Sequence, residues 1–333
     1  FRLSGVHSRD AVVDGFMLYH GDRADPSTFC REGLIEACSA SDCARQGLTI
    51  LNAYDITVHA CSFTGSRGVP PESGIDVESH VDSAVPSNAR IVISACRIAD
   101  HVGGGVLLTE FGGARSLTVT DCSFEACGRF GVFIGAGDCI VRDCRFSRFD
   151  ERIEHGVINI RNRTGGVPPL ITGNVFRDLA MGNPNQAAIY VRPEAGPGTV
   201  IEGNRLEEVD ATGITATAPG TIVRGNVLRG NRRDGLRIGG DCMVDGNLIG
   251  GMTGVGPAIL IYGGGTVVRA NQLVNCDNGA AGSIRVIQEP GEPLGPSIVT
   301  DNLFRLKPAN GRAVAVNLTV PGIERGNDVF GYD

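Results

Sequence analysis

The chain has 333 residues, of which 48 are Gly, none is Trp and 42% are apolar. Its length would suggest two domains at about 150 residues each, and its apolar content is enough for a large core, which excludes a disordered chain. The net charge is −7, and every basic residue except Lys307 is a dispersed Arg. This composition lacks the basic surface of a nucleic-acid-binding protein, so no nucleic-acid partner is expected.

Several common motifs are missing. A P-loop needs Gly-Lys-Ser/Thr, whereas Lys307 follows Leu306 and precedes Pro308. The sequence contains neither Cys-x-x-Cys nor His-Glu-x-x-His, the common zinc patterns. No run of 18 apolar residues occurs, so neither a membrane-spanning helix nor a membrane partner is expected. The 11 Cys are an odd number without the spacing of a small disulfide scaffold.

The first part of the chain is irregular. Asp14-Gly15-Phe16 resembles a degenerate copy of the repeat that becomes clear further on. Residues 20 to 46 interrupt that repeat, and Asp25-Pro26-Ser27-Thr28 is predicted to begin a short helix, because Pro suits a first helical turn. Cys30, Cys38 and Cys43 lie in this segment and could form one disulfide or none.

From residue 61 onward, a repeat of the form (Cys or Asn)-x-apolar runs through the chain. Its first residue, which we call the lead residue, recurs every 21 to 35 residues. Val or Ile stands three residues before ten of the eleven lead residues. The lead residues are Cys61, Cys96, Cys122, Cys144, Asn174, Asn204, Asn226, Asn247, Asn271, Asn302 and Asn327.

A second short strand recurs in each period, and a glycine usually opens it, as in Gly74-Ile75-Asp76-Val77 and Gly131-Val132-Phe133-Ile134. Alternation of apolar and polar residues is typical of strands. Intervals of 21 or 22 residues leave no room for a crossover helix, which excludes a TIM barrel or a doubly wound sheet. The pattern predicts an all-β parallel solenoid of about 11 to 12 coils. It would be a single domain over residues 1–333, with a loop or short-helix insertion at about 20–46.

Stacking explains the lead residues. Successive coils lie about 4.8 Å apart, so the same position in every coil forms a column. Stacked Asn side chains can form a hydrogen-bonded ladder, and the smaller Cys is readily buried in the same column. We therefore expect the lead Cys residues to serve packing. No polar cap is obvious at either end, although solenoids need capping, and whether a natural N-terminal cap is missing is left open.

This combination resembles the pectate-lyase-like superfamily of right-handed parallel β-helix proteins. The Asn column and the preceding x-Val-x-x-Asn-x-Phe rhythm carry the resemblance over residues 5 to 330. It implies a right-handed solenoid with a substrate cleft on the sheet of glycine-opened strands. Ser73-Gly74-Ile75-Asp76-Val77-Glu78 resembles a Gly-Ile-Asp-x-Glu segment of carbohydrate-related β-helix proteins. Asp76 loosely matches the Asp of the Tyr-Gly-x-Asp-Pro-His motif of alginate epimerases, but the Tyr is absent and the Pro-His is replaced.

Alternation predicts which side chains point out of that sheet. The expected face has an acidic end, a glycine floor with one aromatic ring, and an arginine end, and Arg suits substrate carboxylates. The candidate catalytic residues on it are Asp76, Glu78, His80, Arg161, Tyr190 and Arg192. The candidate substrate-binding residues are Thr109, Phe133, Asn159, Arg163, Arg237 and Tyr262.

Two reactions fit such a face. In a lyase, a cation or Arg neutralises a uronate carboxylate while a base removes the C5 proton. Arg161 or Arg192 would neutralise, and Asp76 and Glu78 could hold Ca²⁺ through their oxygens. The candidate bases are Tyr190, His80 and His155, and His101 lies in another loop that feeds the face.

In an inverting hydrolase, Asp76 and Glu78 would be the acid and base, about 6.5–7 Å apart on one strand face. We expect a carbohydrate-active enzyme that cleaves an acidic polysaccharide. β-Elimination is the first hypothesis for the reaction, and hydrolysis is the second. A non-catalytic glycan-binding or structural solenoid is the third, because a fold alone does not fix a function. A secreted or periplasmic location is expected, and the oligomeric state is left open.

Overall fold

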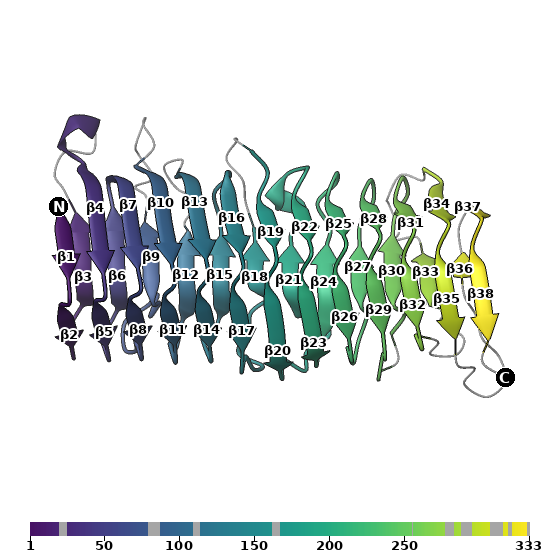
Figure 1. Ribbon diagram of the computed structural model, residues 1–333, viewed down its shortest axis with the longest axis horizontal. Coiled ribbons are helices and arrows are strands. Elements are labelled where there is room, and N and C mark those ends of the chain that lie inside the picture. Colours follow the sequence, from purple (N-terminus) through teal and green to yellow (C-terminus); the bar gives the residue numbers. More distant parts are fainter. Residues whose placement is uncertain are drawn as a thin grey trace. The chain divides into compact units, whose positions relative to one another are not determined.

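The computed structural model describes residues 1–19, 25–78, 87–108, 114–161, 167–254, 256–276, 283–287, 295–306, 316–318 and 322–331. The chain divides into two compact units, residues 1–174 and 175–333, and each is described by itself. In both units, short strands pair in parallel with the strands of the next coil, forming sheets that we call A, B and C (Figure 1).

In the N-terminal unit, each coil contributes one strand to each sheet. Sheet A contains β1 (Arg2–Ser4), β4 (Cys30–Glu36), β7 (Ala53–His59), β10 (Asn88–Ser94), β13 (Arg115–Thr120), β16 (Cys139–Arg142) and β19 (Leu170–Thr172). Sheet B contains β2 (His7–Arg9), β5 (Ser39–Ser41), β8 (Ser62–Thr64), β11 (Arg97–Ala99), β14 (Ser123–Glu125) and β17 (Arg145–Ser147). Sheet C contains β3 (Asp14–Tyr19), β6 (Gln46–Leu51), β9 (Ile75–Glu78), β12 (Gly104–Leu108), β15 (Phe130–Ile134) and β18 (Gly156–Ile160).

The C-terminal unit repeats this arrangement. Sheet A contains β22 (Val200–Glu202), β25 (Ile222–Arg224), β28 (Met243–Asp245), β31 (Val267–Arg269), β34 (Ser297–Thr300) and β37 (Gly322–Arg325). Sheet B contains β20 (Val175–Leu179), β23 (Arg205–Val209), β26 (Val227–Arg229), β29 (Leu248–Gly250), β32 (Gln272–Val274), β35 (Leu303–Leu306) and β38 (Asp328–Gly331). Sheet C contains β21 (Ala187–Val191), β24 (Thr212–Ala216), β27 (Leu236–Ile238), β30 (Ile259–Tyr262), β33 (Ile284–Ile287) and β36 (Val316–Leu318).

Six or seven described strands per sheet in each unit agree with the predicted parallel solenoid of 11 to 12 coils. The described helical segments are two short 3-10 turns, η1 (Pro26–Thr28) and η2 (Pro193–Ala195). The side chain of Asp25 accepts a hydrogen bond from the Ser27 N–H and so caps η1. No helix in the described ranges is long and apolar enough to cross a membrane.

The expected insertion at 20–46 is largely wrong. After η1 the chain forms β4 and β5, whose residues pair in parallel with β7 and β8 as in any other coil. Cys38 is the lead residue of this coil, because its thiol donates to the carbonyl oxygens of Leu3 and Glu36. The coil was missed because Ser39-Ala40 follows its lead residue, where the other coils have a larger apolar side chain.

Asp14-Gly15-Phe16 was also placed in the wrong column. Phe16 pairs with Leu48 and Asp14 pairs with Gln46, so this segment is the glycine-opened strand β3 of sheet C.

Glycine is needed at the start of these strands because the turn before each strand is crowded. A Cβ on Gly47 would lie 2.6 Å from the Gly74 carbonyl oxygen and 2.7 Å from the Phe63 ring.

The predicted lead-residue column is confirmed. In the C-terminal unit, the Asn226 side-chain oxygen accepts from the Asn204 backbone N–H at 2.9 Å, and the Asn226 amide donates to the Ile201 carbonyl at 3.0 Å. The same pattern links Asn247, Asn271 and Asn302. In the N-terminal unit, buried Cys61, Cys96, Cys122 and Cys144 occupy the column, and their thiols donate to backbone carbonyls.

All eleven cysteines are free thiols, including Cys30, Cys38 and Cys43, for which a disulfide was left open. Cys43, Ser66, His101 and Cys127 form a second buried column at the turn after sheet B. His101 is therefore a turn residue, and the prediction that it feeds the sheet C face is wrong. Its Nδ1 accepts from the Ser66 N–H at 3.1 Å, and its Nε2 lies 3.0 Å from the Phe63 carbonyl oxygen.

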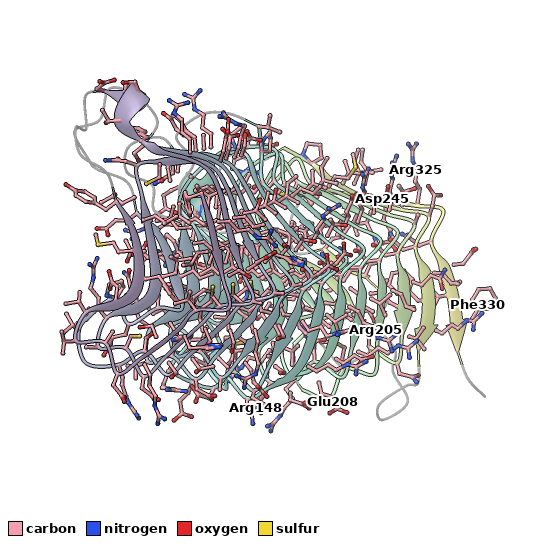
Figure 2. All side chains as sticks on the ribbon, turned by 60° about the vertical axis from the view of Figure 1, so that its left-hand side comes forward. Arg148, Arg205, Glu208, Asp245, Arg325 and Phe330 are labelled. Atoms are coloured by element: carbon pink, nitrogen blue, oxygen red, sulfur yellow. The ribbon has the colours of Figure 1, made fainter. Side chains whose placement is uncertain are left out.

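The outer surfaces of sheets A and B carry charged side chains. Figure 2 shows Arg205 and Glu208 of β23 projecting away from the strands of the C-terminal unit. Neighbouring coils exchange ion pairs there, such as Arg269 with Asp245 at 3.2 Å. Exposed pairs of this kind contribute little stability, so the apolar interior and the two buried columns hold the coils together.

Candidate functional site

A buried polar cluster lies on sheet C of the N-terminal unit, across the adjacent strands β3, β6 and β9. We call it the acid cluster. It consists of Asp14, Arg45, Gln46, Thr49, Asp76 and Glu78. The side chain of Asp14 is 3% exposed, and Asp76 as a whole is 2% exposed. Two carboxyl groups are therefore closed off from water within one small region.

The contacts within the acid cluster are short. Gln46 Nε2 donates to Asp76 Oδ2 at 2.6 Å, and Thr49 Oγ1 lies 2.7 Å from Asp14 Oδ2. Thr49 Oγ1 also contacts Gln46 Oε1. Among the described residues, the second oxygens of Asp14 and Asp76 have no hydrogen-bond partner. Both carboxyls are thus anchored through one oxygen each.

Arg45 lies between the remaining charges. Its Nη2 is 3.0 Å from Glu78 Oε2, and its Nη1 is 3.5 Å from Asp14 Oδ2. The Arg45 side chain is 24% exposed and that of Glu78 is 38% exposed, so this ion pair forms the solvent-facing part of the acid cluster. One guanidinium therefore contacts the carboxyl groups of Asp14 and Glu78, and its charge also acts on Asp76.

This environment changes the acidity of Asp76. Burial, and next the negative charge of Glu78, raises the pKa of Asp76 to about 7, although the Gln46 hydrogen bond and Arg45 act in the opposite direction. A carboxyl group that titrates near neutral pH can accept or give up a proton under ordinary conditions, as a general acid or base must. Strongly shifted carboxyl groups gather at functional sites.

The predicted column on sheet C has the predicted register. Asp76, Leu107, Phe133 and Asn159 are partners on successive strands of the N-terminal unit. Their expected exposure is wrong for Asp76 and for Asn159, which is completely buried. Alternation along a strand fixes the face on which a side chain lies, but it carries no information on what covers that face.

The other described candidates of this unit differ in exposure. Phe133 is half-buried, with its ring centroid 5.5 Å from that of Phe130. Arg161 is exposed directly after β18, and His155 is half-buried before it. Glu154, directly before His155, forms an ion pair with Arg129 at 2.6 Å.

The remaining candidates of the sheet C column belong to the C-terminal unit. Tyr190, Thr215, Arg237 and Leu260 are register partners there. The Arg192 guanidinium lies 6.0 Å from the centre of the half-buried Tyr190 ring. That these residues share a substrate with Asp76 stays a prediction.

Arg237 is already engaged. It forms an ion pair with Asp234 at 2.8 Å and donates to the Pro184 carbonyl at 3.1 Å. Tyr262 is half-buried at the end of β30. His80, Thr109 and Arg163 lie outside the described residues.

Sequence reasoning missed Asp14, Arg45, Gln46 and Thr49. The available signal was the residue directly before each opening glycine. Asp14 precedes Gly15 and Gln46 precedes Gly47, and these two residues are register partners. Comparing that position across coils would have placed both polar side chains on one edge of sheet C, next to Asp76.

The donors around Asp76 and Glu78 do not fit calcium well. A Ca²⁺ ion takes six to eight oxygen ligands, whereas here the Arg45 guanidinium supplies the positive charge between Asp14 and Glu78. Within the described ranges, no group of three or more His, Cys, Asp or Glu side chains is arranged to hold a metal ion. Calcium at Asp76 and Glu78 stays a prediction.

A surface hollow of about 580 Å³ lies elsewhere, on sheet B of the C-terminal unit, where Arg177, Arg205, Glu207 and Arg229 line it. Glu207 binds Arg177 at 2.7 Å and also binds Arg205. These charges largely compensate one another, and no titratable group in the hollow is buried. The acid cluster is therefore the stronger candidate site.

Residues 2–150 match the family model described as a right handed beta helix region. No curated protein sequence matches the chain. Among solved structures, the A-module of mannuronan C-5 epimerase AlgE6 from Azotobacter vinelandii is similar at 12% identity and a TM-score of 0.61, over 100% of this chain and 91% of that chain.

Two lyases are similar to a comparable degree. Alginate lyase AlyF-OU02, in a complex with G6, has 10% identity and a TM-score of 0.60, over 96% of this chain and 83% of its own. A mannuronic acid specific polysaccharide family 6 lyase from human gut microbiota has 11% identity and a TM-score of 0.61, over 96% and 77%. At such identities the likeness shows the fold alone: this chain is a right-handed parallel β-helix, as the superfamily resemblance implied.

Proposed function

We propose that the protein cleaves uronate-containing polysaccharides by β-elimination at the acid cluster. The observation that carries the proposal is Asp76, a carboxyl group held beside Arg45 and Glu78 with its pKa raised to about 7. The β-helix neighbours named as an alginate lyase and a mannuronan epimerase support the choice of a uronate polymer. A polymer substrate makes a secreted or periplasmic location part of the same proposal.

The proposed chemistry needs three groups. Arg45, at the solvent-facing side of the cluster, neutralises the uronate carboxylate and so makes the C5 proton more acidic. Asp76 in its ionised form takes that proton, the C4–O bond breaks, and a C4=C5 double bond forms. The departing oxygen takes up a proton from water, because the Glu78 carboxylate is held in an ion pair with Arg45. Since Asp76 is buried, the substrate must displace the side chains that cover it.

One observation favours a second candidate, an inverting glycoside hydrolase. Asp76 and Glu78 lie two residues apart on one strand, with carboxyl groups in different settings: Asp76 is buried and Glu78 is paired with Arg45. An acid and a base held in contrasting environments are the arrangement that glycoside hydrolysis requires. In this reaction Asp76 would protonate the glycosidic oxygen, and Glu78 would activate water.

A panel of uronate polymers separates the candidates. The protein is incubated with polymannuronate, polyguluronate and polygalacturonate, and both ultraviolet absorbance and reducing ends are followed. New reducing ends with the absorbance of an unsaturated product support β-elimination, whereas reducing ends alone support hydrolysis. Binding without either signal would make the protein a glycan-binding solenoid and overturn both. A parallel series with a chelator, and with added calcium, tests the calcium site that was expected from the sequence.

A further inference from the structure

The acid cluster contains a continuous hydrogen-bonded line between its two buried carboxyl groups. Asp14 of β3 contacts Thr49 of β6, Thr49 contacts Gln46 on the same strand, and Gln46 contacts Asp76 of β9. Gln46 and Thr49 are completely buried, so water cannot supply additional hydrogen bonds to either side chain. The hydrogen-bond donors and acceptors along this line must therefore pair with one another.

Counting hydrogens along this line favours a state in which one of the two carboxyls is protonated. The Thr49 hydroxyl has one hydrogen, yet it lies against Asp14 Oδ2 and against Gln46 Oε1. If the Gln46 amide nitrogen faces Asp76, Thr49 donates to Gln46, and Asp14 must be protonated in order to donate to Thr49. If the amide is turned over, its nitrogen donates to Thr49, Thr49 donates to Asp14, and Asp76 must carry the proton.

The two arrangements hold the same number of protons and differ only in which carboxyl is neutral. We propose that Asp14 and Asp76 share one proton through Thr49 and Gln46, and that Asp14 is the positioning residue that determines when Asp76 is ionised. The shared proton does not depend on any substrate. Its role in proton transfer by Asp76 rests on the proposed function.

The surrounding charges also favour one proton on the pair of Asp14 and Asp76. Among the described residues, Arg45 is the one cation of the acid cluster. It contacts Asp14 and Glu78 and lies farther from Asp76. Three ionised carboxyls would leave two uncompensated negative charges, whereas a shared proton leaves one. The neighbouring Cys43 thiol adds no charge, because burial raises its pKa. Burying an unpaired charge is costly, so the singly protonated pair is the more stable state.

Thr49→Val tests the proposal directly, because it removes the hydroxyl while keeping the shape and every charge. Aspartates labelled with ¹³C at the side-chain carboxyl are titrated by NMR in the wild type, in Thr49→Val and in the matched control Thr49→Ser. Without the hydroxyl, the state of Asp14 no longer constrains the Gln46 amide, and Gln46 donates permanently to Asp76. We expect the Asp76 midpoint to fall by about one pH unit or more in Thr49→Val and to stay in place in Thr49→Ser.

Asp14→Asn provides a second measurement, because an Asn amide donates to Thr49 as protonated Asp14 would. The Asp76 midpoint is expected to fall in this variant as well. A purely electrostatic effect of Asp14 would lower the midpoint in Asp14→Asn but not in Thr49→Val. An unchanged or raised Asp76 midpoint in Thr49→Val overturns the shared proton. The titration uses no substrate, so it can fail or succeed independently of the polysaccharide assays.

Discussion

At the scale of single residues, two buried titratable side chains make opposite contributions to the pH dependence of stability. The folded pKa of Asp76 lies above its ordinary value of 3.8, at about 7, so folding takes up a proton there and stability falls as the pH rises between these values. The folded pKa of His101 is lowered from 6.5 to about 4 by burial, so stability falls as the pH drops through that range. Where the two windows overlap, the effects largely cancel.

Asp76→Asn is therefore expected to stabilise the protein at about pH 8 while removing its proton-transfer group. The difference between 3.8 and about 7 corresponds to roughly 4 kcal/mol, an upper value because the structure relaxes around a buried charge. The urea midpoint of Asp76→Asn should exceed that of the wild type at about pH 8 and approach it at about pH 4. A midpoint below that of the wild type at about pH 8 would mean that the ionised carboxylate holds the fold together.

His101→Cys should reduce the loss of stability in acid. Cys127 occupies the same buried column one coil further on, so a thiol fits this turn. The lowered pKa of His101 corresponds to roughly 3 kcal/mol that the wild type loses between about pH 6.5 and pH 4. The measurement uses an Asp76→Asn background, because the opposing pH dependence of Asp76 is absent there. Across this pH range, the urea midpoint of Asp76→Asn with His101→Cys should vary less than that of Asp76→Asn alone. Equal acid dependence with and without His101 would contradict its assignment as a neutral turn residue.

At the scale of strands and turns, the lead-residue column carries the fold. Asn226 is completely buried, its oxygen accepts the Asn204 N–H, and its amide donates to the Ile201 and Arg224 carbonyls. Asn226→Ala removes these hydrogen bonds, at about 1–3 kcal/mol for each buried group that is left without a partner, whereas the Arg224 carbonyl still accepts the Gly203 N–H. We expect the variant to lower the urea midpoint clearly, with faster hydrogen exchange at the Asn204 amide.

Asn327→Ala is the matched control, because Asn327 occupies the same column but is only half-buried. Its cost should be the smaller of the two, since water can replace the lost hydrogen bonds. If the two substitutions cost the same, burial of the column is not what makes the ladder stabilising.

The columns also explain how far the sequence could be read. Asn and Cys lead residues with period-2 strands were enough for the parallel solenoid, because stacking repeats the same requirement in every coil. Cys38 and the strand containing Asp14 were missed, since the first coils deviate from the later ones in residue type. The burial of Asp76 could not be predicted from the sequence, because it depends on contacts with Gln46 of the preceding coil. The acid cluster forms only when β3, β6 and β9 pair in register.

At the scale of the whole molecule, a parallel β-helix carries the acid cluster on three adjacent strands of sheet C. Elsewhere on sheet C, the described outward side chains include the half-buried Phe133 and the ion-paired Arg237. The acid cluster differs because its carboxyl groups outnumber its cation. This excess of buried acid is what gives Asp76 a proton to exchange near neutral pH, and it is the basis for proposing catalysis there.

The most direct test of that claim is the rate at which unsaturated product forms from a uronate polymer, measured side by side for three proteins. These are the wild type, Asp76→Asn, and Asp245→Asn as a control that removes a carboxylate from an exposed ion pair of sheet A. The wild type and Asp245→Asn should cleave equally, and Asp76→Asn should be at least about 100-fold slower, as expected when a general base is removed. An Asp76→Asn protein as active as the wild type would contradict the assignment of the acid cluster as the catalytic site.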